Sequence, residues 1–262
     1  MKIGILTIAT GRYLEYWKDM VASALVNLNN SDYEITFHVF TERYNEAQKF
    51  SRNFKQFEFK VHRIPGYGWP EATLLRYEII DKLKDQYYED VLMHLDADML
   101  IHGNFLESIK WDELIGGIGL VAHPGFWRPR REKRIKLYLR YPRILFSDIR
   151  SLLMYGGLGT WETRKQSRAF VKRRDRRHYV CGGSWFGTRS KFLELIGTCA
   201  ESVQRDLAQD QIAVWHDESH LNLWAAENNF SLLSPSYCYD PTYPQLLQLQ
   251  DLIRAVDKGN KN

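Results

Sequence analysis

Residues 91–98 read Val-Leu-Met-His-Leu-Asp-Ala-Asp, a short apolar run that ends in two carboxylates. The run predicts a buried strand over 91–95. Because alternate side chains of an extended chain project to one face, Asp96 and Asp98 should point the same way. Open α/β sheets bind ligands at the carboxyl ends of their strands. Two hard oxygen ligands there suit Mn²⁺ or Mg²⁺ bound together with a diphosphate, although a pair of solvated acids would leave the same pattern.

Strands and helices alternate on the N-terminal side of this run. Apolar β-type stretches separate two segments with helical spacing and a loop rich in Pro and Gly. The predicted elements are strands over 2–9, 34–41 and 57–64, helices over 13–28 and 72–87, and a loop over 65–70. This alternation predicts the α/β class, with a mostly parallel sheet covered by helices on both faces.

The pattern is less regular after Asp98. The predicted elements there are strands over 119–122 and 179–187, helices over 191–207 and 216–227, and a strand end over 232–235. The segment from 128 to 177 has little clear periodicity, and we predict that part of it is a mobile loop. We expect a single domain over 1–262, with a nucleotide-type half to about residue 100 and an acceptor-type half from about residue 101 onward.

The composition, 44% hydrophobic and 26% charged over 262 residues, is that of a soluble globular protein. No stretch approaches the roughly 18 apolar residues of a membrane span, and the first residues lack the features of a signal peptide. Cys181, Cys199 and Cys238 are odd in number and irregularly spaced, which argues against a disulfide framework. We therefore expect a cytoplasmic protein with no transmembrane segment.

Positive charge is concentrated in two windows. Residues 128–150 hold nine Lys or Arg against two Asp or Glu, and residues 161–177 hold eight against two, although the whole chain carries only +4. Such clusters suggest an anionic partner: phosphate, a membrane surface or nucleic acid. Aromatic residues that could stack on bases lie among the cations, namely Tyr138, Tyr141, Phe146 and Trp161. A nucleic-acid-binding module is a lower alternative, beside a solvated loop near an anionic substrate or membrane.

A second chemical cluster is Trp215-His216-Asp217-Glu218-Ser219-His220. On a helix, His216 and His220 lie on one face at positions i and i+4. Zinc hydrolases use two histidines at this spacing, but their catalytic base directly follows the first histidine, where this chain has Asp217. A zinc hydrolase is therefore another lower alternative. Acidic residues also favour a first helical turn, which gives the cluster a purely structural interpretation.

A third feature is the run Cys181-Gly182-Gly183-Ser184-Trp185-Phe186-Gly187. Glycines allow close approach of the backbone to a ligand, so the Gly pair beside two large rings could form a slot the size of a sugar. A tight turn or a bulge in a strand would explain the same residues. The sequence pattern by itself leaves both interpretations open.

These features, in this order, resemble glycosyltransferase family 6, which includes the blood-group A and B transferases and the α-1,3-galactosyltransferases. The resemblance runs from about residue 3 to residue 241, and its most specific string is His-Asp-Glu-Ser-His-Leu-Asn at 216–222. The other matching residues are 7–13, Trp69, Arg76, 96–98, 123–126, 179–187, 213–215, 233–235, Tyr237 and Asp240.

The resemblance implies a GT-A fold, in which a Rossmann-like nucleotide-binding half is fused to an acceptor-binding half. It also implies retaining transfer of a galactose-type sugar from a UDP-sugar donor to a glycan acceptor through an α-1,3 linkage. By resemblance, the uridine would contact Thr7, Ile8, Ala9 and Tyr13, and the diphosphate and donor sugar would contact Arg76. Mn²⁺ or Mg²⁺ would be held by Asp96 and Asp98, and the donor sugar would also contact His216 and Asp217. The acceptor would contact Trp215, His123 and Asp240.

Glu218 is implied to lie beneath the anomeric carbon and to be the catalytic residue, also within reach of the acceptor. It could attack that carbon and form a covalent glycosyl-enzyme. It could instead stabilise an oxocarbenium-like centre while the acceptor enters on the face that the leaving group vacates. Both routes retain the configuration of the sugar, so the sequence leaves the choice open.

The donor is inferred from side-chain volume. In the family, the triplet at Cys181, Gly182 and Gly183 and the residue at Gly125 tune the space around the C2 substituent of the sugar. Glycines at 125 and 183 match the A-type transferase, so we predict UDP-N-acetylgalactosamine as donor and a galactose-containing acceptor. UDP-galactose is the alternative donor, and Cys181 departs from the residues usual at its position.

Other departures concern the ends of the chain and the metal. Mammalian members carry a membrane anchor and stem that this sequence lacks, which leads us to expect a bacterial or phage protein. Many bacterial relatives have Asn-x-Asn and work without metal, whereas Asp96 and Asp98 predict metal dependence. The tail that closes over UDP is not clearly matched, and Lys258 and Lys261 are expected in a solvated tail. A sugar-binding protein without catalysis is the last alternative, but binding alone does not require this set of carboxylates.

Overall fold

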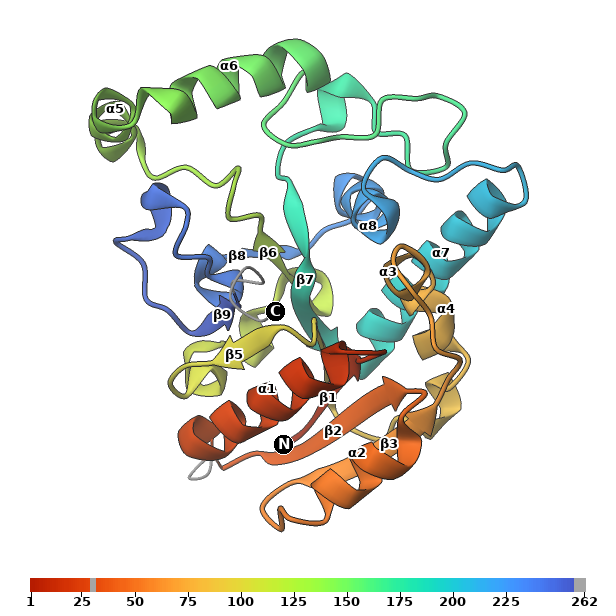
Figure 1. The fold of residues 1–262 in the computed structure, drawn as a ribbon. Coiled ribbons are helices and arrows are strands. Elements are labelled where there is room, and N and C mark those ends of the chain that lie inside the picture. Colours follow the sequence, from red (N-terminus) through yellow and green to blue (C-terminus); the bar gives the residue numbers. More distant parts are fainter. Residues whose placement is uncertain (29–31, 257–262) are drawn as a thin grey trace.

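The computed structural model describes residues 1–28 and 32–256. Its centre is a seven-stranded sheet in the order β3-β2-β1-β4-β7-β6-β8 (Figure 1). The strands are β1 (Lys2–Ile8), β2 (Glu34–Thr41), β3 (Glu58–Arg63), β4 (Val91–Leu95), β6 (Ile118–Ala122), β7 (Val180–Thr188) and β8 (Ser231–Leu233). The pairings are parallel except that β7 runs antiparallel to both β4 and β6. The predicted α/β class and mostly parallel sheet are confirmed.

Helices cover both faces of this sheet (Figure 1). The α-helices are α1 (Tyr13–Leu28), α2 (Tyr44–Ser51), α3 (Glu71–Leu74), α4 (Arg76–Asp81), α5 (Arg131–Arg140), α6 (Pro142–Tyr155), α7 (Arg189–Leu207) and α8 (His216–Glu227). Short 3₁₀ helices span Lys84–Gln86, Phe105–Ser108, Trp111–Glu113, Ile115–Gly117, Arg173–Asp175, Pro235–Cys238 and Pro244–Leu246. A separate two-stranded sheet pairs β5 (Met99–Ile101) with β9 (Ile253–Ala255).

Two hydrophobic cores hold the layers together. Strand β1 contributes to both, because Ile5 packs against Trp17 and its neighbours on α1, whereas Leu6 points to the opposite face. That second face packs against α4, α7 and α8 through residues such as Phe192 and Trp224. A central strand that is covered on both faces reads as a continuous apolar run, which is the pattern that predicted β1.

Most predicted elements lie at the predicted positions, and three predictions need correction. The helix predicted over 72–87 is divided into α3, α4 and a 3₁₀ turn, because Leu75 leaves the helical region with φ −90° and ψ 4°. Neither α2 nor the strands β5 and β9 were predicted. The segment over 128–177, predicted as partly a mobile loop, contains α5 and α6.

The remaining predictions about the whole chain concern thiols and membrane spans. All three cysteines are buried free thiols, as their spacing predicted. Among the helices that the structure describes, none has the length and apolar character needed to cross a membrane.

Candidate active site

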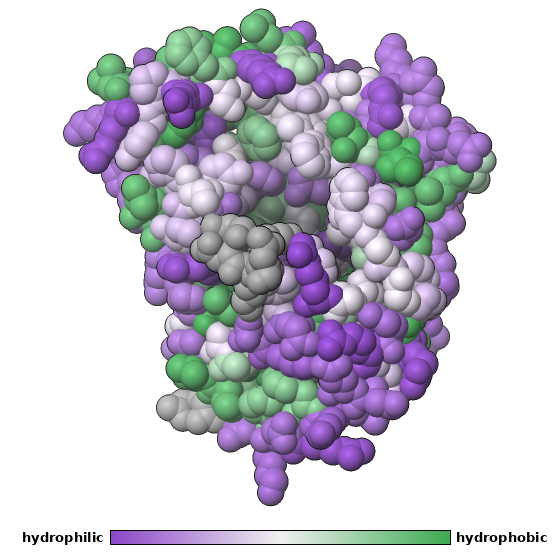
Figure 2. Space-filling view, viewed as in Figure 1, coloured by the Kyte–Doolittle hydropathy of each residue, from purple (hydrophilic) through white to green (hydrophobic). Residues whose placement is uncertain are grey.

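Three adjoining hollows form one cleft at the carboxyl ends of β1 and β4, and Asp96 lines all three. The face of the molecule in Figure 2 is hollowed near its centre. The first hollow is lined by residues that follow β1, among them Tyr13, and by Arg76 at the start of α4. The second reaches the start of α8 at Glu218, and the third reaches Asp240. Residues from both ends of the sequence therefore share one cavity.

The antiparallel strand β7 creates this meeting point. β4 runs toward the cleft and β7 runs away from it, and the last residue of β4, Leu95, pairs with Ser184 in the middle of β7. The Asp96 backbone N–H then donates to the Gly183 carbonyl at 2.9 Å. Asp96 and Asp98 both line the cleft, with Asp98 more deeply buried. Their carboxylate oxygens could hold Mn²⁺ or Mg²⁺, with phosphate and water oxygens as further ligands.

Arg76 is the buried cation at the centre of the cleft. Its Nη2 lies 3.0 Å from Asp96 Oδ1 and its Nε 3.2 Å from Asp217 Oδ2. Its Nη1 donates to the Gly182 carbonyl at 2.7 Å and to His94 Nε2 at 2.9 Å. Burial opposes the charge, but Asp217 and Asp96 hold the pKa of Arg76 above its ordinary value. The guanidinium therefore stays charged and ties three segments of the chain together.

Glu218 faces the cleft from the first turn of α8 with both carboxylate oxygens bonded. Tyr179 donates its hydroxyl to Oε1 at 2.8 Å, and the Gly182 N–H donates to Oε2 at 2.8 Å. Burial raises the pKa of Glu218 to about 7, although these two hydrogen bonds and Arg76 favour the charged form. Burial likewise raises the pKa of Asp217 to about 7, against the opposing effect of Arg76. The two carboxyl groups are thus poised to change protonation near neutral pH.

The glycine pair lies in a strand that is locally irregular. The register between β6 and β7 shifts where Leu120 pairs with Trp185 but Ala122 pairs with Val180. A Cβ atom at Gly182 would lie 3.2 Å from Asp217 Oδ2, and one at Gly183 would lie 2.7 Å from the end of the Met99 side chain. The bulge interpretation is therefore correct, and the bulge brings backbone, rather than side chains, to the cleft wall.

Comparisons with known proteins show what the chain is similar to. A model described as glycosyltransferase family 6 matches residues 157–262. The chain is 26% identical over 243 residues to histo-blood group ABO system transferase 1 of Rattus norvegicus, covering 91% of this chain and 61% of that protein. It is 26% identical over 267 residues to globoside alpha-1,3-N-acetylgalactosaminyltransferase 1 of Gallus gallus, covering 99% and 68%. It is 27% identical over 267 residues to O-antigen biosynthesis glycosyltransferase WbnI of Escherichia coli, covering 98% and 96%.

The chain is thus similar to glycosyltransferase family 6, over its C-terminal part in the family model and over nearly its whole length in these relatives. It spans about three fifths of the length of the rat relative and nearly the whole length of the bacterial one. The mostly parallel seven-stranded sheet fits the GT-A-like fold that the resemblance implied. The matched segment contains β7 and α8, which supply Gly182 and Glu218.

The fold brings most of the candidate residues to one cleft. Ile8 and Tyr13 line its first hollow, whereas Thr7 and Ala9 are completely buried and do not line it. The other candidates that line the cleft are Arg76, Asp96, Asp98, His123, Cys181, Gly182, Gly183, Trp215, His216, Asp217, Glu218 and Asp240. Gly125 lies beside them, since a Cβ atom there would be 3.3 Å from the Tyr243 hydroxyl. Lys258 and Lys261 lie outside the described residues.

The two histidines of α8 have different surroundings. The ring of His216 packs edge-on against Trp69, with ring centres 5.2 Å apart. His220 is buried on the other side, where its Nδ1 lies 2.8 Å from Ser202 Oγ. Across residues 1–28 and 32–256, no three His, Cys, Asp or Glu side chains are grouped to hold a metal ion. The structure therefore gives no support to the zinc-hydrolase alternative.

The aromatic residues proposed to stack on nucleic-acid bases are mostly not available for stacking. Trp161 is buried at 1% exposure, and its Nε1 donates to the Leu158 carbonyl. The Tyr138 hydroxyl donates to buried Asp148 at 2.7 Å. Of the proposed stacking residues, Phe146 is 68% exposed. One exposed ring does not form the row of rings on which successive bases would stack.

Among the cleft residues for which no role was predicted are Tyr179, His94 and Tyr243. Tyr179 bonds Glu218, His94 bonds Arg76, and Tyr243 lines two hollows beside Asp240. His94 could have been found, because it lies two positions before Asp96 in the chain and so shares its face of the strand. Tyr243 follows a Pro-Thr turn with no periodic pattern, so no local signal marked it.

Proposed function

We propose that this chain is a retaining, metal-dependent glycosyltransferase that moves N-acetylgalactosamine from UDP-N-acetylgalactosamine to a galactose-containing glycan. The new bond would be an α-1,3 linkage. The observation that carries the proposal is the buried Arg76, which joins Asp96 to Asp217 while Glu218 is fixed beside them. The names of the relatives, which include ABO and globoside transferases, support the same class of reaction.

The charge of the cleft supports the need for a divalent cation. Its described walls carry five carboxyl groups and two guanidinium groups, namely Asp96, Asp98, Asp217, Glu218 and Asp240 against Arg12 and Arg76. A bare diphosphate would be repelled by this excess of negative charge. We propose that Asp96 and Asp98 hold Mn²⁺ or Mg²⁺, which supplies positive charge to the leaving diphosphate.

The two ends of the cleft would bind different substrates, the nucleotide at one end and the acceptor at the other. Residues before about 100 would form the nucleotide end, where Ile8 and Tyr13 line a pocket suited to a flat base. Later residues would form the acceptor end around His123 and Asp240. The burial of His123 lowers its pKa to about 4, so its ring is neutral at physiological pH and can accept or donate a hydrogen bond.

Glu218 is the proposed catalytic residue at the junction of these ends. Its carboxylate must be ionised whether it attacks the anomeric carbon or stabilises positive charge there. The Tyr179 hydroxyl and the Gly182 N–H hold its oxygens in fixed positions before any substrate arrives. Such preorganisation lowers the cost of reaching the transition state. The neighbouring Arg76 pairs with both Asp96 and Asp217 and so offsets the negative charge of these two carboxylates, of which Asp96 interacts electrostatically with Glu218.

The absence of side chains at three positions supports the larger donor. Cβ atoms at Gly125, Gly182 and Gly183 would approach His123, Asp217 and Met99, respectively, within 3.2 Å. A larger residue at any of these positions would displace its neighbour in the cleft wall, so we infer that the glycines keep the wall back from an N-acetyl group. UDP-galactose is the alternative donor. The buried free thiols favour a reducing location such as the cytoplasm.

The test is transfer by the purified chain from both UDP-sugars to a panel of galactose-terminated glycans, with Mn²⁺, with Mg²⁺ and with EDTA. We expect faster transfer from UDP-N-acetylgalactosamine, loss of activity in EDTA, and an α-1,3 linkage by NMR. Glu218→Gln should lower kcat by about a thousandfold, of the order seen when an electrostatic catalytic group is removed. Glu194→Gln on the exposed face of α7 is the control and should match the wild type. An inverted product, or a fully active Glu218→Gln variant, would refute the proposal.

A further inference from the structure

Helix α6 is oriented against the usual rule for a helix on a protein surface. Its apolar side chains point outward: Leu145, Phe146, Ile149, Leu152 and Leu153 are all exposed, and Leu153 is 80% exposed. Its buried residues are polar, namely Asp148 and Ser151. Surface helices normally bury the apolar stripe and expose the polar one.

Polar anchors explain how the helix is held in this orientation. Asp148 accepts hydrogen bonds from the Arg128 guanidinium and from the Tyr138 hydroxyl of α5. Ser151 bonds the carbonyls of Gly157 and Gly159 at 2.9 and 2.8 Å. These contacts fix the inner face of α6, so the outward apolar face is a defined surface of the fold.

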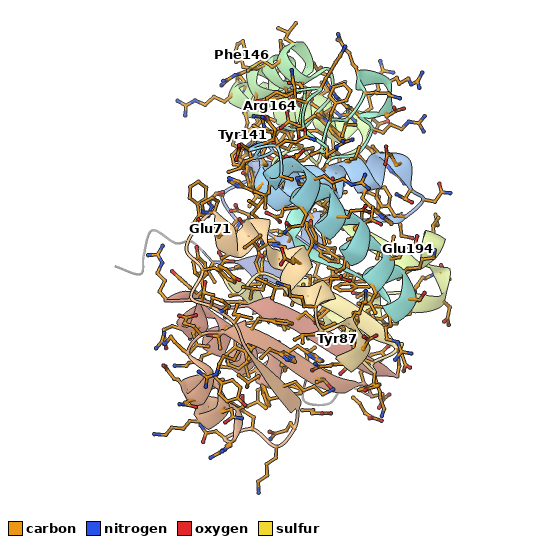
Figure 3. The ribbon with its side chains drawn as sticks, turned by 90° about the vertical axis from the view of Figure 1, so that its right-hand side faces the viewer. Glu71, Tyr87, Tyr141, Phe146, Arg164 and Glu194 are labelled. Carbon is orange, nitrogen blue, oxygen red and sulfur yellow. The ribbon has the colours of Figure 1, made fainter. Side chains whose placement is uncertain are left out.

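Helix α5 continues the same surface. Ile135 and Leu139 lie one turn apart on α5, and both are exposed apolar side chains. The two helices lie together at one end of the molecule (Figure 1), and we call residues 131–155 the α5–α6 platform. Figure 2 shows apolar residues among strongly polar ones along this end, and Figure 3 places Phe146 at its outer limit.

The apolar stripe is accompanied by positive charge. Exposed cations of the platform are Arg131, Lys133, Lys136, Arg140, Arg143 and Arg150. The acidic residues of the platform are Glu132, which is exposed, and Asp148, which is already paired with Arg128. Apolar side chains that enter acyl chains, flanked by cations that meet phosphate, are the pattern of helices that lie on anionic membranes.

We propose that the α5–α6 platform binds the surface of an anionic phospholipid bilayer. The aliphatic stripe enters the boundary between headgroups and acyl chains, and the surrounding Lys and Arg side chains contact lipid phosphates. The inference is independent of the proposed reaction, because it rests on the outward stripe and its cations alone.

Two other partners fit the platform less well. Nucleic acid would need exposed rings for stacking, whereas the platform exposes mainly Leu and Ile and its Tyr138 is bonded to Asp148. A second copy of the chain would bring cations such as Arg140 and Arg143 of one copy against those of the other, which costs free energy. An anionic bilayer satisfies both the apolar and the charged parts of the surface.

The platform is connected to the acceptor end of the cleft. Arg128, which binds Asp148 of α6, also donates to the Gly125 carbonyl at 2.8 Å. A hollow between α5 and the 3₁₀ helix at 244–246 is lined by Tyr141 and Gln245, and Gln245 donates to the Pro124 carbonyl at 2.9 Å. Membrane attachment would therefore hold the acceptor end of the cleft near the lipid surface.

Vesicle flotation tests the proposal with the intact chain. We expect binding to mixed phosphatidylcholine–phosphatidylglycerol vesicles, weak binding to phosphatidylcholine alone, and release by salt. The double variant Phe146→Ser and Leu153→Ser should lower the partition coefficient at least about tenfold, because it removes apolar side chains from the bilayer. Lys136→Gln and Arg143→Gln should each lower it about fivefold, which corresponds to about 1 kcal/mol per cation. Val26→Ser, at an 80% exposed apolar position of α1, is the matched control.

The proposal would be overturned if the protein did not bind anionic vesicles, or bound neutral vesicles equally well. It would also be overturned if Val26→Ser lowered vesicle binding as much as the platform variants do. A dimer or an RNA complex that depends on the platform, without vesicle binding, would overturn it as well. A second readout does not depend on the serine variants. A fluorophore attached through Phe146→Cys should shift to shorter wavelength with anionic vesicles, since the three native cysteines are buried. An unshifted spectrum while the protein floats would also refute insertion of the stripe.

Discussion

Glu218 is balanced between two opposing effects. Burial favours its neutral form, while the Tyr179 hydroxyl, the Gly182 N–H and Arg76 favour the carboxylate. The resulting pKa of about 7 means that small changes around this side chain alter its charge at physiological pH. The residues that donate to Glu218 are therefore expected to set the pH range of activity.

Tyr179→Phe tests this expectation. The variant removes the donor to Glu218 Oε1 and keeps the ring that packs between His123 and Trp161. Since the hydroxyl lowers the pKa of Glu218, its loss should move the acidic limb of the kcat profile upward by about one pH unit.

The control for this variant is Tyr87→Phe. It removes a buried hydroxyl that donates to the Ile80 carbonyl at 3.1 Å, away from the cleft. Its pH profile should match that of the wild type. An unchanged acidic limb in Tyr179→Phe would mean that Glu218 does not govern this limb.

Gly183→Ala separates donor selection from metal binding. Its Cβ atom would meet Met99 Cε at 2.7 Å and Asp96 Oδ2 at 3.1 Å. The flexible end of Met99 can move, so we expect kcat/KM to fall several-fold more with UDP-N-acetylgalactosamine than with UDP-galactose. Parallel kinetics with both donors provide the measurement. Equal losses, together with a higher Mn²⁺ requirement, would instead show that the methyl group displaces Asp96.

At the scale of the elements, sequence patterns predicted the regular parts of the fold and missed the platform. Strands β2 and β4 and helices α1 and α8 begin and end where they were predicted, because each has one apolar face or two. Helices α5 and α6 were not identified. Sequence patterns predict a helix from the apolar face that it buries. Helix α6 buries the polar residues Asp148 and Ser151 instead, so this criterion did not detect it.

In the candidate site, too, local sequence patterns predicted some features and missed others. Strand geometry predicted that Asp96 and Asp98 share one side. Both line the cleft, but β4 ends at Leu95 and residues 97–98 form a turn, so the turn and not an extended strand places Asp98. The link from Asp96 through Arg76 to Asp217 joins three distant segments, and no local spacing records such a contact. Resemblance to a family suggested these residues together, whereas the Tyr179 hydrogen bond to Glu218 became apparent only in the structure.

Asp148→Asn should destabilise the α5–α6 platform. Asp148 and Arg128 are both buried, and Tyr138 adds a hydrogen bond at 2.7 Å. Loss of the charge leaves the Arg128 guanidinium buried without its counter-ion, so we expect a cost of about 3 kcal/mol in urea unfolding.

The matched control is Asp175→Asn. Asp175 also pairs with an arginine, Arg174, but at 3.7 Å and with both side chains exposed. Exposed ion pairs contribute little, so the cost should stay below about 1 kcal/mol. Similar losses in the two variants would contradict a special role for the buried pair.

At the scale of the whole molecule, buried histidines predict weak resistance to acid. Burial lowers the pKa of His62, His123 and His220 to about 4. The folded state therefore binds fewer protons than the unfolded state between about pH 6.5 and pH 4. The free energy of unfolding should fall as the pH drops through this window, by several kcal/mol in total.

His62→Gln should reduce this dependence. His62 is a residue of β3, and its Nε2 lies 3.1 Å from Nδ1 of His38 on β2, outside the cleft. Its replacement should remove about a third of the loss between pH 6.5 and pH 4, measured by urea unfolding at several pH values. The exposed His178→Gln is the control and should leave the slope unchanged. A wild-type protein whose stability is flat over this range would contradict the prediction.

The position of β7 has a consequence for how the chain is made. This strand joins β4 to β6, yet it follows them in sequence after the whole α5–α6 platform. During translation, β4 and β6 therefore emerge with open edges that nothing pairs until residues 180–188 leave the ribosome. A chain cut between 156 and 179 would separate the two sides of the sheet from the strand that unites them. The parts of the chain before and after this cut are thus one cooperative unit, and neither is expected to fold alone.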